Sequence, residues 1–365
     1  MRAGRRARVA VVGVGWWACR LHLVALGENP DAEVVVLCDR DETRVREAAR
    51  IFDVPVAVTD VGAVIDAGVD CAIVATPHDA HFEPAAALLD AGIDVLVEKP
   101  MTLDPAQAWD LVRRAERTGA RLHVGYPFLH SPHVARLREV VAGGELGRPV
   151  LSQGLFATGV RRLLAGDVSG QLEHGGLFAS SASTYSDPRR GGGQMTSQMT
   201  HAVAVMLSTT GLHPLSVSAF SHFGGLQVDL ADSLAVRLSD GSVATIATTG
   251  SVLAHASRIE EYRFFAAGGH ALLDTVHGQL EIARGESPLQ AEPPLTEAQA
   301  NPERATSQAL VAAAIDPDRH RPLAAPGELG ADVVALLAAA AESAATGTPV
   351  TAYRPPAGAR PAPTG

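Results

Sequence analysis

Lysine occurs once in the 365 residues, at Lys99, and the other 29 of the 30 basic residues are arginine. Arginine is effectively never deprotonated in a protein, whereas burial or a nearby cation shifts a lysine ammonium toward neutrality. Proton transfer is therefore the chemistry for which position 99 would need a lysine. Composition alone leaves this open, because one lysine can also remain by chance in an arginine-rich chain.

The tripeptide Glu98-Lys99-Pro100 follows a short apolar run, Asp94–Val97, that we expect to be a buried parallel strand. Ligands of parallel sheets bind outside the carboxyl ends of the strands. A surface Glu–Lys pair beside a turn proline is the plain structural alternative. The strand-end position and the single lysine together favour an active-site lysine.

A glycine-rich turn lies between an expected strand, Arg8–Val12, and an expected helix, Trp17–Leu26, with the spacing G-x-G-x-x-A. The glycines permit close approach of the backbone to a pyrophosphate, which the following helix N-terminus attracts. Asp39, at the end of the second expected strand, can accept both adenosine ribose hydroxyls and so favours NAD, while Arg40 leaves NADP open. The predicted dinucleotide site comprises Gly13, Gly15, Trp16, Trp17, Ala18, Asp39 and Arg40.

Histidine and threonine follow another expected strand, Cys71–Ala75, in the sequence Thr76-Pro77-His78. At a strand end these residues could line the nicotinamide side of the site, although an ordinary strand-to-helix turn has the same composition. His22 and His81 are expected on helices. A lone helical histidine more often packs or caps than binds a ligand.

A run of glycines, Gly191–Gly193, leads into an expected helix, Gln194–Thr210. Ser197 and His201 are four residues apart and share a face of an α-helix, with Gln198 on the adjoining polar stripe. A flexible loop and one solvated helix face would give the same pattern. The apolar character of the opposite face favours a polar site.

The sequence lacks the motifs of metal sites and of a nucleophilic serine. The sequence has no H-E-x-x-H, no paired Cys/His cluster and no Asp-rich loop, so we expect no metal site. His130 and His133 have suggestive spacing but no third ligand. No G-x-S-x-G elbow for a nucleophilic serine is present.

Composition bounds the class of protein. The chain is 47% apolar and 19% charged with a net charge of −10, which is typical of a globular protein of about two domains and argues against nucleic-acid binding. The uninterrupted apolar runs fall short of the ~20 residues that span a bilayer. Three widely spaced cysteines, Cys19, Cys38 and Cys71, exclude a disulfide framework and fit a reducing cytoplasm.

Alternating strands and helices fill the first part of the chain and predict a parallel, doubly wound sheet. Gly92 and Gly119 are expected as left-handed helix caps. The remaining expected strands are Glu33–Cys38 and Arg121–Val124, and the helices are Glu42–Phe52, Ala80–Ala91 and Pro105–Thr118.

Beyond Gly125 the pattern predicts an α+β domain with a mostly antiparallel sheet. Its expected elements are a helix at Ser131–Ala142, a strand at Pro149–Ala157, a long loop at Gly159–Gly192, strands at Leu215–His222, Asp232–Leu238, Ser242–Thr249, Glu261–Ala267, Ala271–Thr275 and Gln279–Ala283, and a helix at Leu329–Ala345. We therefore predict a Rossmann domain over 1–126, an α+β substrate and oligomerisation domain over 127–353, and a disordered tail over 354–365.

Together these motifs resemble the glucose–fructose oxidoreductase / inositol dehydrogenase / MocA (GFO/IDH/MocA) family almost end to end. The resemblance implies a Rossmann domain followed by an open-sheet α+β domain, with the substrate between them. It implies NAD(P)-linked hydride transfer at a carbinol or keto carbon of a sugar, cyclitol or sugar derivative. The matching residues are Gly13-x-Gly15-x-x-Ala18 with His22 and Asp39, Ala75-Thr76-Pro77 with His81, Ala91–Pro100, Gly125-Tyr126 with Pro132, Gly191–His201 and Ser343–Val350.

The resemblance also implies roles. Lys99 matches the catalytic lysine that passes the hydroxyl proton, His201 matches the active-site histidine, and the peptide bond before Pro100 is expected to be cis. A cytoplasmic homodimer or homotetramer, joined through the second sheet, is expected, with no nucleic-acid or membrane partner. The implied cofactor residues are, besides the glycine turn and Asp39, Thr76, Pro77, His81, Glu98 and Lys99; the implied substrate residues are Ser197, Gln198 and Tyr126.

Two departures from the family pattern stand out. Ser197 replaces the acid that family members commonly carry four residues before the histidine, and Pro127 replaces the usual arginine after Gly-Tyr. Two alternatives therefore stay open: a redox-neutral, NAD-dependent enzyme that eliminates or hydrolyses a glycoside, and a non-catalytic NAD-binding regulator. Four loop arginines would make a nucleotide-sugar substrate plausible if they converged on the cleft, the plain alternative being solvated side chains: Arg161, Arg162, Arg189 and Arg190.

Overall fold

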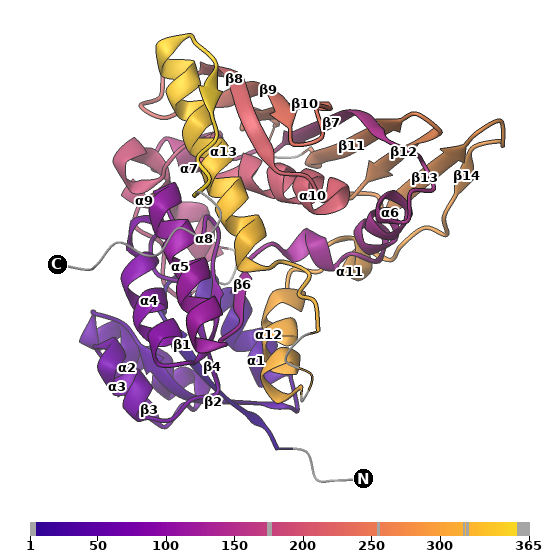
Figure 1. The fold of residues 1–365 in the computed structure, drawn as a ribbon. Helices are drawn as coiled ribbons and strands as arrows, with labels where there is room; N and C mark the ends of the chain where they lie inside the picture. Colours follow the sequence, from indigo (N-terminus) through magenta and orange to yellow (C-terminus); the bar gives the residue numbers. More distant parts are fainter. Residues whose placement is uncertain (1–4, 174–176, 254–255, 317, 319–320, 356–365) are drawn as a thin grey trace.

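The computed structural model describes residues 5–173, 177–253, 256–316, 318 and 321–355. Figure 1 shows two sheets with helices packed around and between them. Within the described residues the first sheet has six parallel strands in the order β3-β2-β1-β4-β5-β6, which confirms the expected doubly wound sheet. These strands are β1 (Ala7–Val12), β2 (Ala32–Cys38), β3 (Val56–Val58), β4 (Cys71–Val74), β5 (Asp94–Val97) and β6 (Leu122–Val124).

Side chains that cap the helix ends determine where the helices between these strands begin and end. The Asp41 carboxylate accepts from the Arg44 N–H at the start of α2, and Asp104 does the same for Ala106 at the start of α5. Gly119 ends α5 with a φ of 73°, as predicted. The helices are η1 (Ala18–His22), α1 (Leu23–Gly27), α2 (Glu42–Phe52), α3 (Val61–Asp66), η2 (His78–Ala80), α4 (Phe82–Asp90) and α5 (Pro105–Thr118).

The second sheet has nine strands among the described residues, in the order β14-β13-β12-β11-β7-β10-β9-β8-β15. It is antiparallel except where β10 runs parallel to β7, so the predicted mostly antiparallel sheet is confirmed. Its strands are β7 (Pro149–Ala157), β8 (Pro214–His222), β9 (Ala231–Leu238), β10 (Val243–Thr249), β11 (Ile259–Ala266), β12 (Gly269–Asp274), β13 (Gln279–Arg284), β14 (Gln290–Ala291) and β15 (Val350–Thr351).

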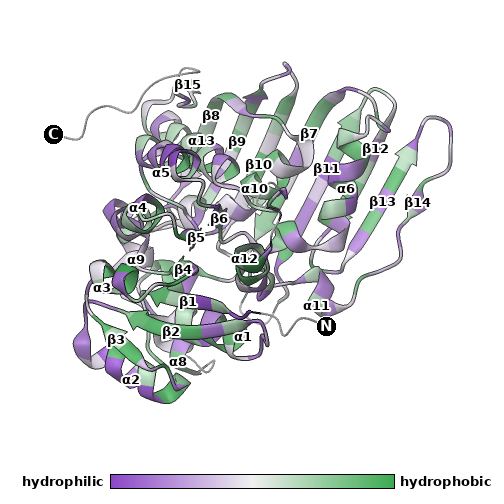
Figure 2. Cartoon of the chain, turned by 60° about the horizontal axis from the view of Figure 1, so that its bottom comes forward, coloured by the Kyte–Doolittle hydropathy of each residue, from purple (hydrophilic) through white to green (hydrophobic). Residues whose placement is uncertain are grey.

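Helices cover one face of this sheet and leave the other face open, as Figure 2 shows. Buried and exposed residues alternate along β9 and β10, as one-sided burial requires. The covering helices are α6 (Pro132–Ala142), α10 (Thr200–Thr210) and α13 (Gly327–Thr346).

Helix α13 is long and apolar enough to cross a membrane by length and composition alone. In the fold it packs on β8, α5 and α10, and 61% of its most apolar stretch is buried. Its apolar character is therefore that of a core helix.

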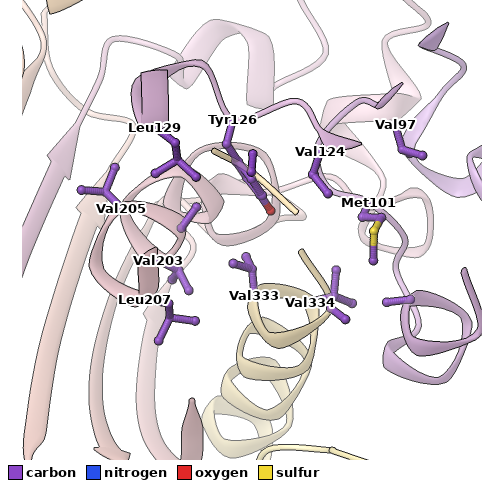
Figure 3. Close-up of a cluster of buried hydrophobic side chains, with 14 of the residues drawn as sticks. Val97, Met101, Val124, Tyr126, Leu129, Val203, Val205, Leu207, Val333 and Val334 are labelled. Atoms are coloured by element: carbon purple, nitrogen blue, oxygen red, sulfur yellow. The ribbon is translucent and has the colours of Figure 1, made fainter. Parts of the chain in front are cut away.

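One apolar cluster links the two sheets (Figure 3). It places the ends of β5 and β6 against α10 and α13, so the packing that stabilises the fold also brings the two parts of the site together. The labelled side chains in the close-up are Val97, Met101, Val124, Tyr126, Leu129, Val203, Val205, Leu207, Val333 and Val334.

Some elements were not predicted. Helix α12 (Ala305–Ile315) returns to the first sheet and packs on α1, β1, β4 and β5. Apolar residues, mostly alanine, occur on every side of this helix, so its sequence does not show the one-sided apolar pattern that identifies a surface helix. The expected loop over 159–192 contains α7 (Arg161–Leu164), α8 (Ser169–Glu173), α9 (Ser183–Ser186) and η4 (Pro188–Arg190), and α3, β3, α11 (Glu297–Ala300), β14 and β15 are further additions.

The tail that we predicted to be disordered is residues 354–365, and 356–365 of it lie outside the described residues. Arg354 lies in the described part and its guanidinium is paired with Asp332. The disorder of the tail stays a prediction.

Candidate functional site

Lys99 leaves the carboxyl end of β5 and reaches the second part of the molecule. Its Nζ donates a hydrogen bond of 2.8 Å to the backbone carbonyl of Ser197. Burial lowers the pKa of Lys99, and the negative charge of Glu98 opposes this shift. The Lys99–Pro100 peptide bond is cis, as the resemblance implied.

His201 lies in the first turn of α10, 8% exposed, with its ring stacked on Phe156 at a centroid distance of 5.8 Å. Phe128 meets the ring edge-on at 5.3 Å. Burial, reinforced by the charges of Lys99 and Arg258, holds the pKa of His201 well below 6.5, so the imidazole is neutral at physiological pH. Its Nδ1 has no hydrogen-bond partner among the described residues.

Ser197 is placed differently from the expectation that its hydroxyl binds substrate. Its side chain is fully buried, and the hydroxyl donates to the carbonyl of Gly193. The expected α-helix here begins with a π turn, η5 (Met195–Met199), whose wider winding changes the faces that a 3.6-residue period predicts. What Ser197 offers the site is its carbonyl, whereas Gln198 is half-buried and remains a candidate for binding substrate.

Tyr126, which we expected to bind substrate, has a buried side chain, and its contact with substrate stays a prediction. Only 1% of it is exposed, and its hydroxyl is 2.9 Å from the Thr200 hydroxyl. Its ring meets His201 edge-on at 6.1 Å, and burial raises the pKa of the phenol. Tyr126 therefore supports the start of α10 from behind.

The glycine turn has the geometry that a dinucleotide needs. Gly13 has a φ of 89°, and a Cβ there would lie 2.6 Å from the backbone nitrogen of Thr76. A Cβ on Gly15 would meet nothing within 4 Å, which leaves space in front of the helix N-terminus. The Val14 N–H donates 3.0 Å to Asp39, so the carboxylate that would bind ribose is held against this turn.

Two arginines flank Asp39. Arg40 is exposed, as an alternative contact for a 2′-phosphate would require. Arg44, which we did not predict, lies 3.9 Å from the Asp39 carboxylate and 5.7 Å from the centre of the Phe178 ring. The sequence places Arg44 on the first turn of the expected helix Glu42–Phe52, but it does not indicate that the side chain lies beside Asp39.

The tryptophans of the turn face the second part of the chain. Trp16 Nε1 donates 2.9 Å to the carbonyl of Gln171, and the Arg20 guanidinium lies over both indole rings at 5.4 and 5.8 Å. The Nε1 of Trp17 is buried without a partner in the described structure. Ala18 is fully buried, which allows the helix to pack closely on the sheet.

The residues after β4 are tied to the Lys99 segment. Thr76 donates its hydroxyl to Ala80, and His78 is buried with Nδ1 3.1 Å from the Gly191 carbonyl. Burial lowers the pKa of His78 to about 3. His81 is also buried, with Nδ1 and Nε2 each 2.8 Å from a carbonyl, those of Pro100 and Thr76, so its ring lies between these two segments.

Glu98 is the buried carboxylate of the site. Its Oε1 is 3.1 Å from His22 Nε2, and its Oε2 accepts from the Lys99 N–H at 3.1 Å. Gly125 leaves room for it, because a Cβ there would lie 2.6 Å from Oε1. His22 Nδ1 is 2.7 Å from the Ser307 hydroxyl of α12, a helix that the sequence did not predict.

The four loop arginines do not converge. Each is bonded elsewhere, so the phosphate grip that we considered is not formed; three of the four are exposed, as the plain alternative expects, whereas Arg190 is half-buried. Their partners are the Gly224 carbonyl for Arg161, Asp167 for Arg162, Asp187 for Arg189, and Asp79 for Arg190. In the described part of the chain no group of three His, Cys, Asp or Glu residues could hold a metal ion.

Comparisons with known proteins match both halves of the chain. Residues 7–126 match the profile described as an oxidoreductase family with an NAD-binding Rossmann fold. Residues 134–272 match the GFO/IDH/MocA C-terminal domain. The second match begins eight residues after the first one ends and stops within β12, so the two matches together span most of the chain.

Curated relatives match over part of their length. A protein of Amycolatopsis mediterranei provisionally named a UDP-kanosamine synthase oxidoreductase subunit is 38% identical over 42% of this chain and 43% of its own. An inositol 2-dehydrogenase of Mycolicibacterium smegmatis is 36% identical over 40% of this chain and 42% of its own. The matched region is thus about two fifths of each relative.

Among solved structures, GenD2 from gentamicin A biosynthesis in complex with NAD has a TM-score of 0.76 and 24% identity. The match covers 97% of this chain and 98% of that one. At this identity the likeness establishes the shared fold.

Proposed function

The chain belongs to the GFO/IDH/MocA oxidoreductase family, and on that premise we propose that it is an NAD-dependent enzyme that oxidises a carbinol carbon or reduces a keto carbon of a sugar, cyclitol or sugar derivative. The observation that carries the proposal is the 2.8 Å contact between Lys99 Nζ and the Ser197 carbonyl. It joins the strand end beside the dinucleotide turn to the helix that carries His201.

The residues around the turn fit NAD. Gly13 and Gly15 let the backbone approach the pyrophosphate, Asp39 would hold the adenosine ribose, and the Thr76–Pro77 turn and Glu98 would line the nicotinamide side. When bound, NAD supplies the hydride acceptor or donor. Arg44 beside Asp39 is an added contact at the adenosine end.

Lys99 is proposed as the proton-transfer residue. Its burial favours the neutral amine, which takes the hydroxyl proton during oxidation and returns it during reduction. His201, neutral and with an unpartnered nitrogen, is placed to hydrogen-bond the same hydroxyl. Its ring is fixed by Phe156 and Phe128, so the hydrogen bond is oriented before substrate binds.

The substrate is recognised without a carboxylate at position 197. Ser197 uses its hydroxyl inside the helix, so the proton steps fall to Lys99 and His201 alone. Gln198 is proposed to bind a neighbouring hydroxyl. The names of the relatives, an inositol dehydrogenase and a nucleotide-sugar synthase subunit, support a polyhydroxylated ring as the substrate class.

The assembly is proposed to be a homodimer or homotetramer through the open face of the second sheet. That face carries a shallow hollow of about 330 Å³ lined by side chains of β7, β9, β10 and β11, and Phe220 at its β8 side is 78% exposed. Light scattering during size-exclusion chromatography tests this, and a monomer at micromolar concentration would contradict it. The three buried free cysteines support a cytoplasmic location.

The test of the function begins with the freshly purified protein. The nucleotide released by acid is identified, and a panel of sugars and cyclitols is then screened for NADH formation at 340 nm. Bound NAD that is reduced by one panel member supports the proposal. Bound NAD with no absorbance change on a broad panel favours the redox-neutral alternative, and a protein that binds no nucleotide contradicts the proposal.

A further inference from the structure

Three buried side chains behind Lys99 form a continuous hydrogen-bonded chain. The Ser307 hydroxyl is 2.7 Å from His22 Nδ1, and His22 Nε2 is 3.1 Å from the Glu98 carboxylate. The other oxygen of Glu98 accepts from the backbone N–H of Lys99. The chain thus runs from α12, distant in sequence, through η1 to the end of β5.

The same residue types make up a Ser–His–acid nucleophilic triad. A nucleophilic serine has to meet its substrate. Ser307 and His22 are both 0% exposed, and α12 packs over them against the first sheet. The geometry therefore excludes attack on a substrate and points to a role that acts through Glu98.

The carboxylate determines which ring nitrogen of His22 carries a proton toward it. An ionised carboxylate only accepts hydrogen bonds, so the proton on Nε2 of His22 faces Glu98. In the neutral ring, Nδ1 then accepts the hydroxyl proton of Ser307. Ser307 thereby fixes the ring orientation, and the ring fixes one oxygen of Glu98 while the Lys99 backbone fixes the other.

The surroundings make Glu98 the charge that matters to Lys99. Burial acts to raise the pKa of Glu98, but the hydrogen bond from His22 and the charge of Lys99 bring it below its usual value, so the group is ionised. The other titratable groups that face this region are held neutral by burial: His78, His81, His201, Tyr126 and Tyr185. Arg258, beside His201, is the further cation.

We propose that His22 and Ser307 are positioning residues that hold the Glu98 carboxylate ionised beside Lys99 and so control how readily Lys99 gives up and takes back its proton. This rests on the proposed proton-transfer role of Lys99. Without the network, Glu98 becomes protonated in its buried site. The ammonium form of Lys99 then loses its counter-charge, and Lys99 titrates at lower pH.

The single lysine makes the test direct. Protein grown with lysine labelled with ¹³C at Cε gives one lysine signal, that of Lys99, and its chemical shift is followed against pH in the full-length chain with NAD added. Glu98→Gln is expected to move the titration midpoint of Lys99 down by about one pH unit or more. The readout needs no turnover, so it does not depend on having the right substrate.

Matched variants separate positioning from packing. His22→Gln keeps an amide N–H near the position of Nε2 and is expected to leave the midpoint at its wild-type value. His22→Asn withdraws that donor from Glu98 and is expected to lower the midpoint, with Ser307→Ala shifting it the same way by less. His133→Gln, a buried histidine bonded to the Pro293 carbonyl in the second part of the molecule, serves as the control and should change nothing.

The outcomes distinguish this inference from the proposed function. A Lys99 midpoint that stays unchanged in folded, NAD-binding Glu98→Gln and His22→Asn proteins overturns the inference while leaving Lys99 as the proton-transfer residue. If His22→Asn does not fold, Ser307→Ala and Glu98→Gln decide the question. Wild-type turnover by Lys99→Met would overturn the proposed function, whereas the titration would still show whether the network acts on Lys99.

Discussion

The two sides of the site differ in how their buried polar groups are satisfied. On the side of the first sheet, His22 uses both ring nitrogens, and Glu98 uses both oxygens. On the side of the second sheet, His201 Nδ1, Gln194 Oε1 and Thr158 Oγ1 are buried without partners among the described residues. A satisfied network favours one arrangement, whereas a buried polar group without a partner is costly unless a water or a ligand completes its bond.

This contrast fits a cofactor bound on the first side and a substrate bound on the second. The cofactor is the same in every turnover, and a rigid, fully bonded edge suits it. The substrate supplies hydroxyls that can complete the bonds of the second side. Trp17 Nε1 is also buried without a partner in the described structure, and it lies beside the glycine turn, where the cofactor itself would bind.

The largest expected effect comes from removing the group that spans both sides. Lys99→Met should lower kcat by about 10³-fold, because general acid–base transfer contributes factors of this size. NAD affinity, measured by fluorescence titration, should change by less than about threefold, since the turn and Asp39 are untouched. A variant with near-normal kcat would remove Lys99 from the mechanism.

The two histidines of the contrast should respond in opposite ways. His22→Leu removes a buried hydrogen-bond partner from both Ser307 and the Glu98 carboxylate and should lower the free energy of unfolding by about 3 kcal/mol. His201→Leu removes an unpartnered nitrogen and should leave stability unchanged or raise it by about 1 kcal/mol, while kcat/KM falls about 10²-fold. Urea unfolding with steady-state kinetics checks both, and equal destabilisation would refute the contrast.

The two glycines of the turn provide a second matched pair. Gly13→Ala places a Cβ at a φ of 89° and 2.6 Å from the backbone of Thr76, and should cost about 2 kcal/mol of stability. Gly15→Ala meets nothing in the protein and should be nearly neutral for stability. It should nevertheless weaken NAD binding by at least about tenfold, because the added methyl lies in the space left for the ligand. Calorimetry of unfolding and of NAD binding separates the two effects.

The smallest effect concerns acid stability. Burial lowers the pKa of His78 to about 3 from an ordinary value of 6.5, so the unfolded chain binds a proton there that the folded chain refuses. The stability is present above pH 6.5 and is lost as the pH falls toward 3, by about 1 kcal/mol between pH 7 and 5.5. His78→Asn can still donate to Gly191 without titrating, so its unfolding free energy should fall less between these two pH values.

Much of the scaffold could be predicted from local sequence. The bounds of α2 and α5 agree with the expectation because Asp41 and Asp104 cap their starts and Gly119 ends α5. The strand end that carries Lys99 was predicted for a similar reason, since Asp94–Val97 is a short apolar run before a proline. These signals are contained within a few residues.

The contacts that complete the site could not be predicted in this way. Ser307 lies on α12, whose alanine-rich sequence has no periodicity and whose place on the first sheet depends on tertiary packing alone. The π turn at Met195–Met199 changes which groups face Lys99, so Ser197 contributes a carbonyl where a hydroxyl was expected. The contacts of His22 with Glu98 and Ser307 depend on the fold of the first sheet and on the packing of α12 against it.

The most direct test of the central claim is chemical rescue at Lys99. Lys99→Ala is assayed at 340 nm with the panel substrate that reduces bound NAD in the wild-type protein, in the presence of small primary amines of different pKa. If Lys99 transfers the proton, the amines restore turnover and the restored rate depends on their pKa. Turnover by Lys99→Ala close to the wild-type rate, or a low rate that no amine of any pKa raises, would show that Lys99 does not transfer the proton.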